Sequence, residues 1–141
     1  MHKSESLIST VYYGFNADTL FLRIDPIIPF AEFEEDTEFL VVTSRPADIK
    51  IAYPIKGEGK IAELFEKTGD EWKKVRDVSE VAALDIFEIG VPFADLKARE
   101  KDEINLFISV RKEGEEIERC PWRGHISVVV PTEDFEAMMW Y

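Results

Sequence analysis

Hydrophobic and polar residues alternate along most of the chain, with the two-residue period that is typical of half-buried β-strands. In the segment 20–25 (LFLRID), three aliphatic residues share one face, while the aromatic, basic and acidic residues share the other. The segment 39–43 (FLVVT) is instead apolar on both faces. The pattern predicts about nine strands, at residues 10–15, 20–25, 39–43, 49–53, 61–65, 72–75, 84–90, 104–111 and 126–130.

Helical patterns are short by comparison. Residues 93–99, directly after a proline, predict one or two helical turns, and residues 132–139 begin with Thr132 as a possible N-cap. Gly14 in YYGF predicts a bulge or a close approach of two strands. Many short strands separated by Gly, Pro and Asp turns predict an all-β fold, an antiparallel and jelly-roll-like β-sandwich.

Composition places these strands in a single domain. At 141 residues with 45% hydrophobic residues, the chain is long enough for one buried core, so we expect one domain over residues 1–141. The 17 basic and 29 acidic residues give a net charge of −12. A surface this acidic repels phosphate backbones and anionic lipids, and the sequence contains no compact basic patch to compensate. We therefore expect neither a nucleic acid nor a membrane as partner.

The chain has no signal-peptide core at its N-terminus and no apolar run of the roughly 18 residues that a membrane span needs. It also has a single cysteine and hence no internal disulfide framework. These features predict a soluble protein of a reducing compartment, the cytoplasm.

Motifs for nucleophilic or nucleotide chemistry are absent from the sequence, including GxSxG, GxGxxG and the phosphate-binding P-loop. Cys120 and His125 are five positions apart and invite comparison with a catalytic dyad, but a free cysteine more often acts as a small buried apolar residue. The only other histidine is His2, so this chain alone cannot assemble a multi-histidine zinc site. We therefore expect no catalytic residue and no resident cofactor.

Calcium is the one metal for which the sequence offers weak candidates. Oxygen ligands are available from Asn16, Asp18 and Asp25, or from the acidic run 34–36, but no EF-hand spacing is present. Paired carboxylates also suit glycosidase chemistry. With 29 acidic residues, however, accidental pairs are inevitable, and the sequence distinguishes none of them.

Aromatic and charged residues near predicted turns and strands are the candidates for ligand contacts. Trp72 and Trp122 can form platforms for the apolar faces of sugars, or they can close the ends of the core. Glu88 interrupts an apolar run, which predicts a partly buried carboxylate with Arg23 or Arg119 as its partner. These three charged residues either form structural ion pairs or line a concave sheet face that meets a ligand.

Three separated motifs resemble a known family. They are MHKSESLISTVYYGFNADTLFLRID, LDIFEIGVPFADL and IERCPWRGHISVVVPTEDFEAMMW, and together they extend from residue 1 to about residue 140. In this order they resemble the C-terminal β-sandwich module of family 57 glycoside hydrolases and their α-amylase-like relatives. Such modules are similar to glucodextranase C-terminal domains, DOMON domains and family 9 carbohydrate-binding modules.

The resemblance implies an accessory role, because catalysis in that family resides in an N-terminal barrel of the (β/α) type. A barrel of that kind needs on the order of 250 residues, more than this chain contains. The chain is then the C-terminal part of a larger glycoside hydrolase or glucanotransferase. Its implied partners are an α-glucan or oligosaccharide and the catalytic barrel of the parent enzyme.

Three other functions remain open at this stage. The domain can be purely structural, with an apolar patch that docks on its parent and no ligand. It can be a redox module, since some DOMON relatives hold haem between methionine and histidine ligands, for which this chain offers Met138, Met139 and His125. It can also be an independent enzyme that acts on a glycoside.

Overall fold

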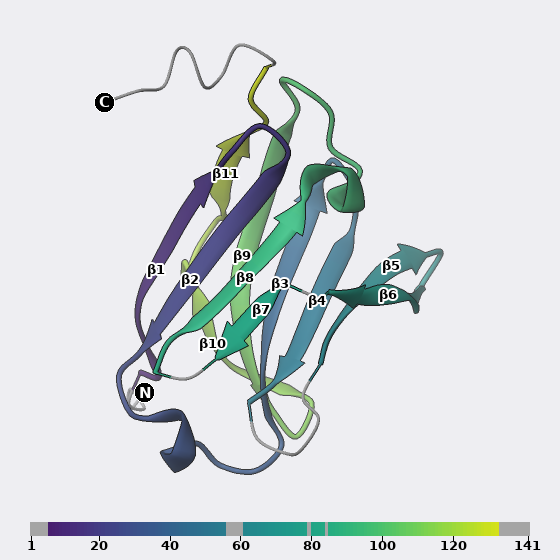
Figure 1. Cartoon of the computed structure of the whole chain (residues 1–141). Coiled ribbons are helices and arrows are strands. Elements are labelled where there is room, and N and C mark those ends of the chain that lie inside the picture. Colours follow the sequence, from purple (N-terminus) through teal and green to yellow (C-terminus); the bar gives the residue numbers. More distant parts are fainter. Residues whose placement is uncertain (1–5, 56–60, 79, 84, 133–141) are drawn as a thin grey trace, which may run out of the picture.

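The computed structural model describes residues 6–55, 61–78, 80–83 and 85–132, which form two antiparallel sheets packed face to face (Figure 1). Sheet A has four strands, in the order β1 (Ile8–Phe15), β2 (Thr19–Pro26), β8 (Phe87–Pro92) and β7 (Val81–Ala83). Sheet B has seven, in the order β10 (Glu115–Cys120), β9 (Glu103–Lys112), β3 (Thr37–Arg45), β4 (Ile49–Pro54), β5 (Ala62–Thr68) and β6 (Glu71–Val78), with β11 (Ile126–Val129) also paired to β9.

The predicted all-β sandwich is confirmed, but the strand count was too low, since the described residues contain eleven strands. Both strands that the sequence pattern missed lie at sheet edges. The strand β7 is only three residues long, and β10 has no residue that is fully buried, so neither shows an apolar alternation.

The helical predictions are partly confirmed. A 3-10 helix, η2 (Phe93–Leu96), forms where residues 93–99 predicted one or two turns, and the structure adds η1 (Phe30–Glu32). Apart from Thr132, the predicted helix at 132–139 lies outside the described residues. None of the helical segments in the described part of the chain is long and apolar enough to cross a membrane.

The core lies between the inner faces of the two sheets. Alternate residues of β2 point into it and are almost completely buried, whereas their neighbours face outward. Aromatic contacts join the two layers, because the ring of Phe87 in sheet A lies 5.5 Å from that of Phe39 and 4.9 Å from that of Tyr53 in sheet B. Burial of a large apolar side chain contributes roughly 1.5 to 3 kcal/mol, so this shared core is the main contribution to stability.

The Glu118 carboxylate connects the chain at the start of β1, in sheet A, to the edge strand β10 of sheet B. Glu118 in β10 accepts hydrogen bonds from the backbone N–H groups of Leu7, at 2.6 Å, and Ile8, at 3.1 Å. The Ser6 hydroxyl donates a third bond, at 2.8 Å. Three donors converge on two acceptor oxygens, so charge-assisted hydrogen bonds hold the chain where it enters β1.

We therefore predict that Glu118→Gln lowers the free energy of unfolding by about 1 to 2 kcal/mol, because an amide nitrogen cannot accept from these donors. Chemical denaturation monitored by circular dichroism measures this loss. Glu115→Gln is the matched control, since Glu115 is an exposed residue of the same strand. Equal effects of the two variants would contradict the role assigned to Glu118.

Candidate functional site

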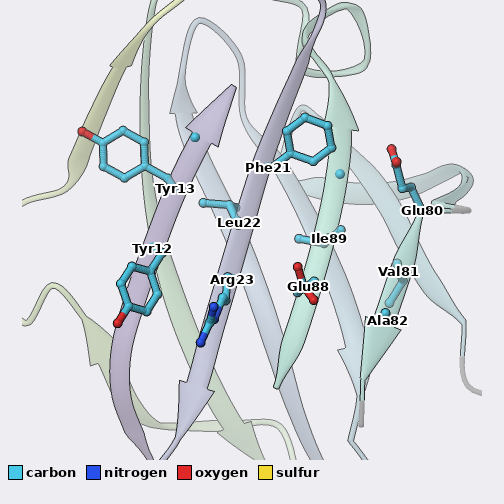
Figure 2. Close-up of a pocket in the computed structure, with 12 residues that line it drawn as sticks. Tyr12, Tyr13, Phe21, Leu22, Arg23, Glu80, Val81, Ala82, Glu88 and Ile89 are labelled. Atoms are coloured by element: carbon cyan, nitrogen blue, oxygen red, sulfur yellow. The ribbon is translucent and has the colours of Figure 1, made fainter. Parts of the chain in front are cut away.

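The outer face of sheet A carries a hollow with a cavity volume of about 540 Å³, which is within the usual size range of ligand sites. Its floor comes from β2 and β8, and its sides come from β1 and from the residues around β7 (Figure 2). The outward positions of β2 form this floor because the alternate positions are committed to the core. The lining residues include three aromatic side chains, two glutamates and one arginine.

An aromatic ring flanked by glycines forms the apolar part of the hollow. Phe21 is in register with Gly14 on one side and with Gly90 on the other. A Cβ atom at position 90 would lie 3.0 Å from Phe21 Cε1 and 2.5 Å from the carboxylate of Glu80, so both side chains lie over Gly90. On the other side, a Cβ at position 14 would have no atom within 4 Å apart from those of its two neighbours along the chain. The space above Gly14 is therefore open.

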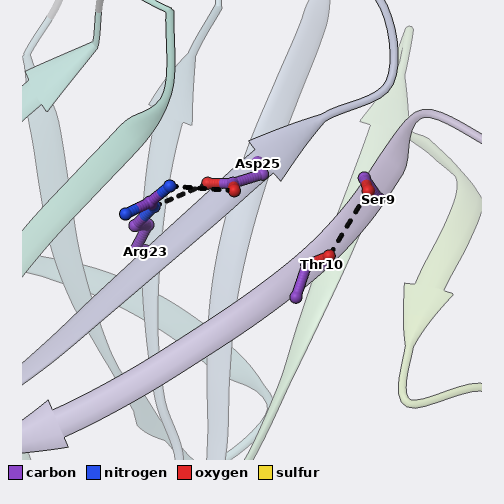
Figure 3. Close-up of polar contacts among 4 residues, drawn as sticks. All are labelled: Ser9, Thr10, Arg23 and Asp25. Atoms are coloured by element: carbon purple, nitrogen blue, oxygen red, sulfur yellow. Dashed lines mark hydrogen bonds and ion pairs between the residues drawn. The ribbon is translucent and has the colours of Figure 1, made fainter.

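The next outward row along the strands is polar. Tyr12, Arg23 and Glu88 are neighbours across β1, β2 and β8. Asp25 binds the Arg23 guanidinium with both carboxylate oxygens, through bonds of 2.7 Å from Nε and 3.0 Å from Nη2 (Figure 3). The guanidinium carbon also lies 4.9 Å from the centroid of the Tyr12 ring. Two independent contacts therefore fix the orientation of this arginine.

The side chains around the hollow give it an exposed aromatic rim and a negative balance of charge. Half of the Tyr12 surface and half of the Tyr13 surface are exposed, and Phe21 is 37% exposed. Tyr13 extends past the outer edge of β1 in Figure 2. Asp25 offsets the charge of Arg23, and Glu80 and Glu88 remain as carboxylates on the same face. Rings and hydrogen-bonding groups therefore converge on a site that does not favour anions.

Arg23 and Glu88 are the two sequence-predicted site residues that the structure brings together in this hollow. The prediction that Glu88 is partly buried is wrong, because its side chain is exposed. The predicted pairing with an arginine is also wrong, since Arg23 forms its ion pair with Asp25. The hydrogen bonds to Asp25 raise the pKa of Arg23 above its ordinary value. The charge of Glu88 also raises this pKa, but more weakly.

Arg119 lies on the other sheet, far from this hollow in the fold. In β10 it pairs with Glu116, at 2.9 Å from Nε to Oε1, and its guanidinium carbon lies 4.0 Å from the centroid of the Phe107 ring. Burial disfavours the charged form of Glu116, but hydrogen bonds from Arg119 and Ser109 outweigh it and lower the pKa of this carboxyl. These contacts agree with the alternative that Arg119 forms a structural ion pair and does not contact a ligand.

The two tryptophans predicted as ligand contacts, Trp72 and Trp122, do not line the hollow either. Trp72 belongs to the β5–β6 hairpin, where the Lys50 ammonium lies 4.8 Å from its ring centroid and that of Lys67 lies 6.0 Å away. Trp122 follows the cis bond to Pro121 in the connection between β10 and β11, and 64% of its surface is exposed. The prediction of core capping is thus wrong for Trp122, while a role in ligand contact stays a prediction for both.

The weak calcium candidates are divided between the two ends of β2. Asn16 and Asp18 lie in the β1–β2 turn, where the Asn16 side chain accepts bonds from the backbone N–H groups of Asp18 and Thr19. Asp25 lies six residues beyond Thr19, or about 20 Å along an extended strand, and is bound to Arg23. In the described ranges, no three His, Cys, Asp or Glu residues are grouped in a way that could hold a metal ion.

The remaining candidates have other surroundings. In the acidic run 34–36, Glu34 forms an ion pair with Lys112. His125 is exposed, and the two methionines predicted as haem ligands lie outside the described residues. Cys120 is half-buried at the edge of sheet B. Its burial raises the pKa of the thiol, and the nearby Glu118 carboxylate raises it further, which is opposite to the activation of a nucleophile.

Sequence reasoning missed the aromatic part of the site. The LFLRID alternation did place Phe21 on the polar face of its strand, which was the available indication that this ring is exposed. Gly14 does not produce the predicted bulge, since the register shift in β1 lies between Ile8 and Thr10. Its effect is to leave the side of Phe21 uncovered.

Comparisons of the chain with protein-family models, with curated proteins and with solved structures found no match. The resemblance to the family 57 module therefore stays a prediction.

The two glycines beside Phe21 give the first prediction about the site. Gly14→Val keeps or raises the melting temperature, because the new side chain meets open space and a β-branched residue suits a strand. Gly90→Val lowers the free energy of unfolding by about 1 kcal/mol, because its Cβ would lie 2.5 Å from the Glu80 carboxylate and 3.0 Å from Phe21, so these side chains must move. Thermal and chemical denaturation measure both effects, and a loss of stability in Gly14→Val would show that its space is not open.

The Cys120 thiol, which lies outside the hollow, gives a prediction about chemical reactivity. Because its pKa is raised, less thiolate is present at pH 8 than in an exposed cysteine, so we expect iodoacetamide to react more slowly with the folded chain than with the chain in guanidinium. The rate should increase as the pH rises. Mass spectrometry of the alkylated product measures the rate, and fast labelling of the folded chain at pH 7 would restore the dyad as a candidate.

Proposed function

We propose that this chain is a non-catalytic carbohydrate-binding module that holds an oligosaccharide on the outer face of sheet A. The observation that carries the proposal is the exposed Phe21 ring, with open space over Gly14 on one side and the row of Arg23 and Glu88 directly beside it. A pyranose has an apolar face and a rim of hydroxyl groups. The Phe21 ring can stack on the apolar face, and Arg23 and Glu88 can donate to and accept from the hydroxyl groups.

The charges of the site support a neutral ligand. Glu80, Glu88 and the Asp25 partner of Arg23 oppose the entry of an anion. A neutral glycan loses little from this field, because its hydroxyl groups can donate to carboxylates as well as accept from the arginine. The net charge of −12 has the same consequence for the whole surface.

The motif resemblance supports the further proposal that the glycan is an α-glucan and that the module serves a larger family 57-like enzyme. Catalysis would then belong to the barrel of the parent protein. The alternative, a structural domain without a ligand, would use the same exposed rings to pack on that barrel. Binding by the isolated chain distinguishes the two roles.

We expect Phe21→Ala to weaken the binding of maltohexaose by tenfold or more, which corresponds to about 1.4 kcal/mol. The loss follows because the variant removes the ring on which the sugar would stack. Isothermal titration calorimetry measures the dissociation constant. Chemical shifts of the β2 and β8 amide groups can be followed in parallel to locate the site.

Trp122→Ala separates this site from the other predicted contact, because it removes a more exposed aromatic ring from a different part of the fold. It should leave the affinity unchanged. A chain that binds no oligosaccharide would contradict carbohydrate binding, and binding that depends on Trp122 but not on Phe21 would move the site to the β10–β11 connection.

A further inference from the structure

We propose that Arg23 and Glu88 together recognise a vicinal diol of the bound sugar, the guanidinium donating to one hydroxyl oxygen and the carboxylate accepting from the neighbouring hydroxyl. This inference rests on the proposed carbohydrate-binding function and names the chemical group that the site selects. It assigns to the hollow a requirement that stacking on Phe21 alone would not impose.

The register of the strands places the two side chains next to each other. Arg23 and Glu88 are directly opposed across β2 and β8, and such residues have Cβ atoms about 4.5 to 5.5 Å apart on the same face. Figure 2 shows both groups in the hollow, on adjacent strands. They nevertheless form no ion pair, because Arg23 is turned toward Asp25. The Arg23 donor and the Glu88 acceptor are therefore adjacent but are not bonded to each other.

Asp25 is a positioning residue in this arrangement. The carboxylate of Asp25 accepts from the Nε–H and from one Nη2–H of Arg23. A guanidinium has five N–H donors, so three remain for a ligand. The Tyr12 ring, 4.9 Å from the guanidinium carbon, supports the same orientation from the side of β1. Less orientational freedom is then lost when a sugar binds.

Glu88 is suited to the complementary role. Its side chain is exposed on the floor of the hollow, between Arg23 on β2 and Ala82 on β7, which leaves space above the small alanine. An ionised carboxylate can only accept hydrogen bonds, whereas the guanidinium can only donate them. Adjacent hydroxyl groups of a sugar can satisfy both at once, because each hydroxyl is a donor and an acceptor.

The spacing of the rows sets the size of the ligand. Phe21 and Arg23 are two positions apart on β2, which separates the apolar row from the polar row by about 6.6 Å. A sugar stacked on Phe21 and a sugar whose diol meets Arg23 and Glu88 are then successive units of one chain. A disaccharide is the smallest ligand that uses both rows.

Linkage chemistry provides the test. Every unit of an α-1,4-glucan retains free hydroxyl groups on C2 and C3, whereas the internal units of an α-1,3-glucan have no free vicinal pair. We expect maltohexaose to bind about threefold more tightly than nigerohexaose, because all six units of the first carry vicinal hydroxyl groups and only the two terminal units of the second do. Isothermal titration calorimetry with both ligands measures the ratio.

Variants then assign the selectivity to the two residues. Glu88→Gln and Arg23→Lys should each weaken maltohexaose binding about tenfold and nigerohexaose binding only about threefold, which brings the ratio of the two affinities close to one. Glu116→Gln and Arg119→Lys are the matched controls, because they alter an arginine and glutamate pair on sheet B. Circular dichroism confirms that each variant is folded.

The possible results separate this inference from the proposed function. Equal affinity for the two glucans, still dependent on Phe21, would overturn diol recognition and leave carbohydrate binding in place. Unchanged selectivity in Glu88→Gln would also overturn it. Absence of binding to both glucans would overturn the inference together with the function on which it rests.

Discussion

Burial of alternate side chains between the two sheets is the constraint on which the rest of the structure depends. The inward residues of β2 and β8 pack against the opposite sheet and are almost completely inaccessible. Because side chains alternate with a period of two, a slip of one residue would exchange Leu22 for Arg23 and place a charge in the core. The cost of that exchange fixes the register of sheet A. It therefore also fixes which strand residues become neighbours on the outer face.

The candidate site is a consequence of this register. Tyr12, Arg23 and Glu88 form one row across three strands, and the next row sets Phe21 between two glycines. A site built on paired strands is held by the backbone ladder, so its side chains need little rearrangement to receive a ligand. Asp25 also restricts the long side chain of Arg23, because its carboxylate binds the guanidinium through two parallel hydrogen bonds. The aromatic and polar rows therefore have a fixed separation.

The sequence pattern was sufficient for the fold class, because strong alternation in segments such as 20–25 reflects the same burial that forms the core. It was insufficient at the sheet edges, where β7 and β10 have few buried residues and hence no alternation to detect. For the site, the pattern could identify Arg23 and Phe21 as outward residues but could not identify their neighbours on β1 and β8, which depend on strand order. Glu88 shows the difficulty: the apolar residues beside it suggested burial, yet Phe87 and Ile89 point inward, and alternation therefore turns Glu88 outward.

Electrostatics link the site to the surface as a whole. Several cations on the described surface form local ion pairs, as in the pairs of Lys74 with Glu63 and Lys112 with Glu34. Arg23 also forms such a pair, with Asp25, but this pair lies at the margin of a hollow whose other charged groups are carboxylates. An anion would thus meet an arginine that is already neutralised and two glutamates that repel it. A neutral diol meets no such penalty, because it can donate to Glu88 while it accepts from the donors that Asp25 leaves unused. The same acidic surface that disfavours nucleic acid is therefore compatible with an uncharged, hydroxyl-rich ligand.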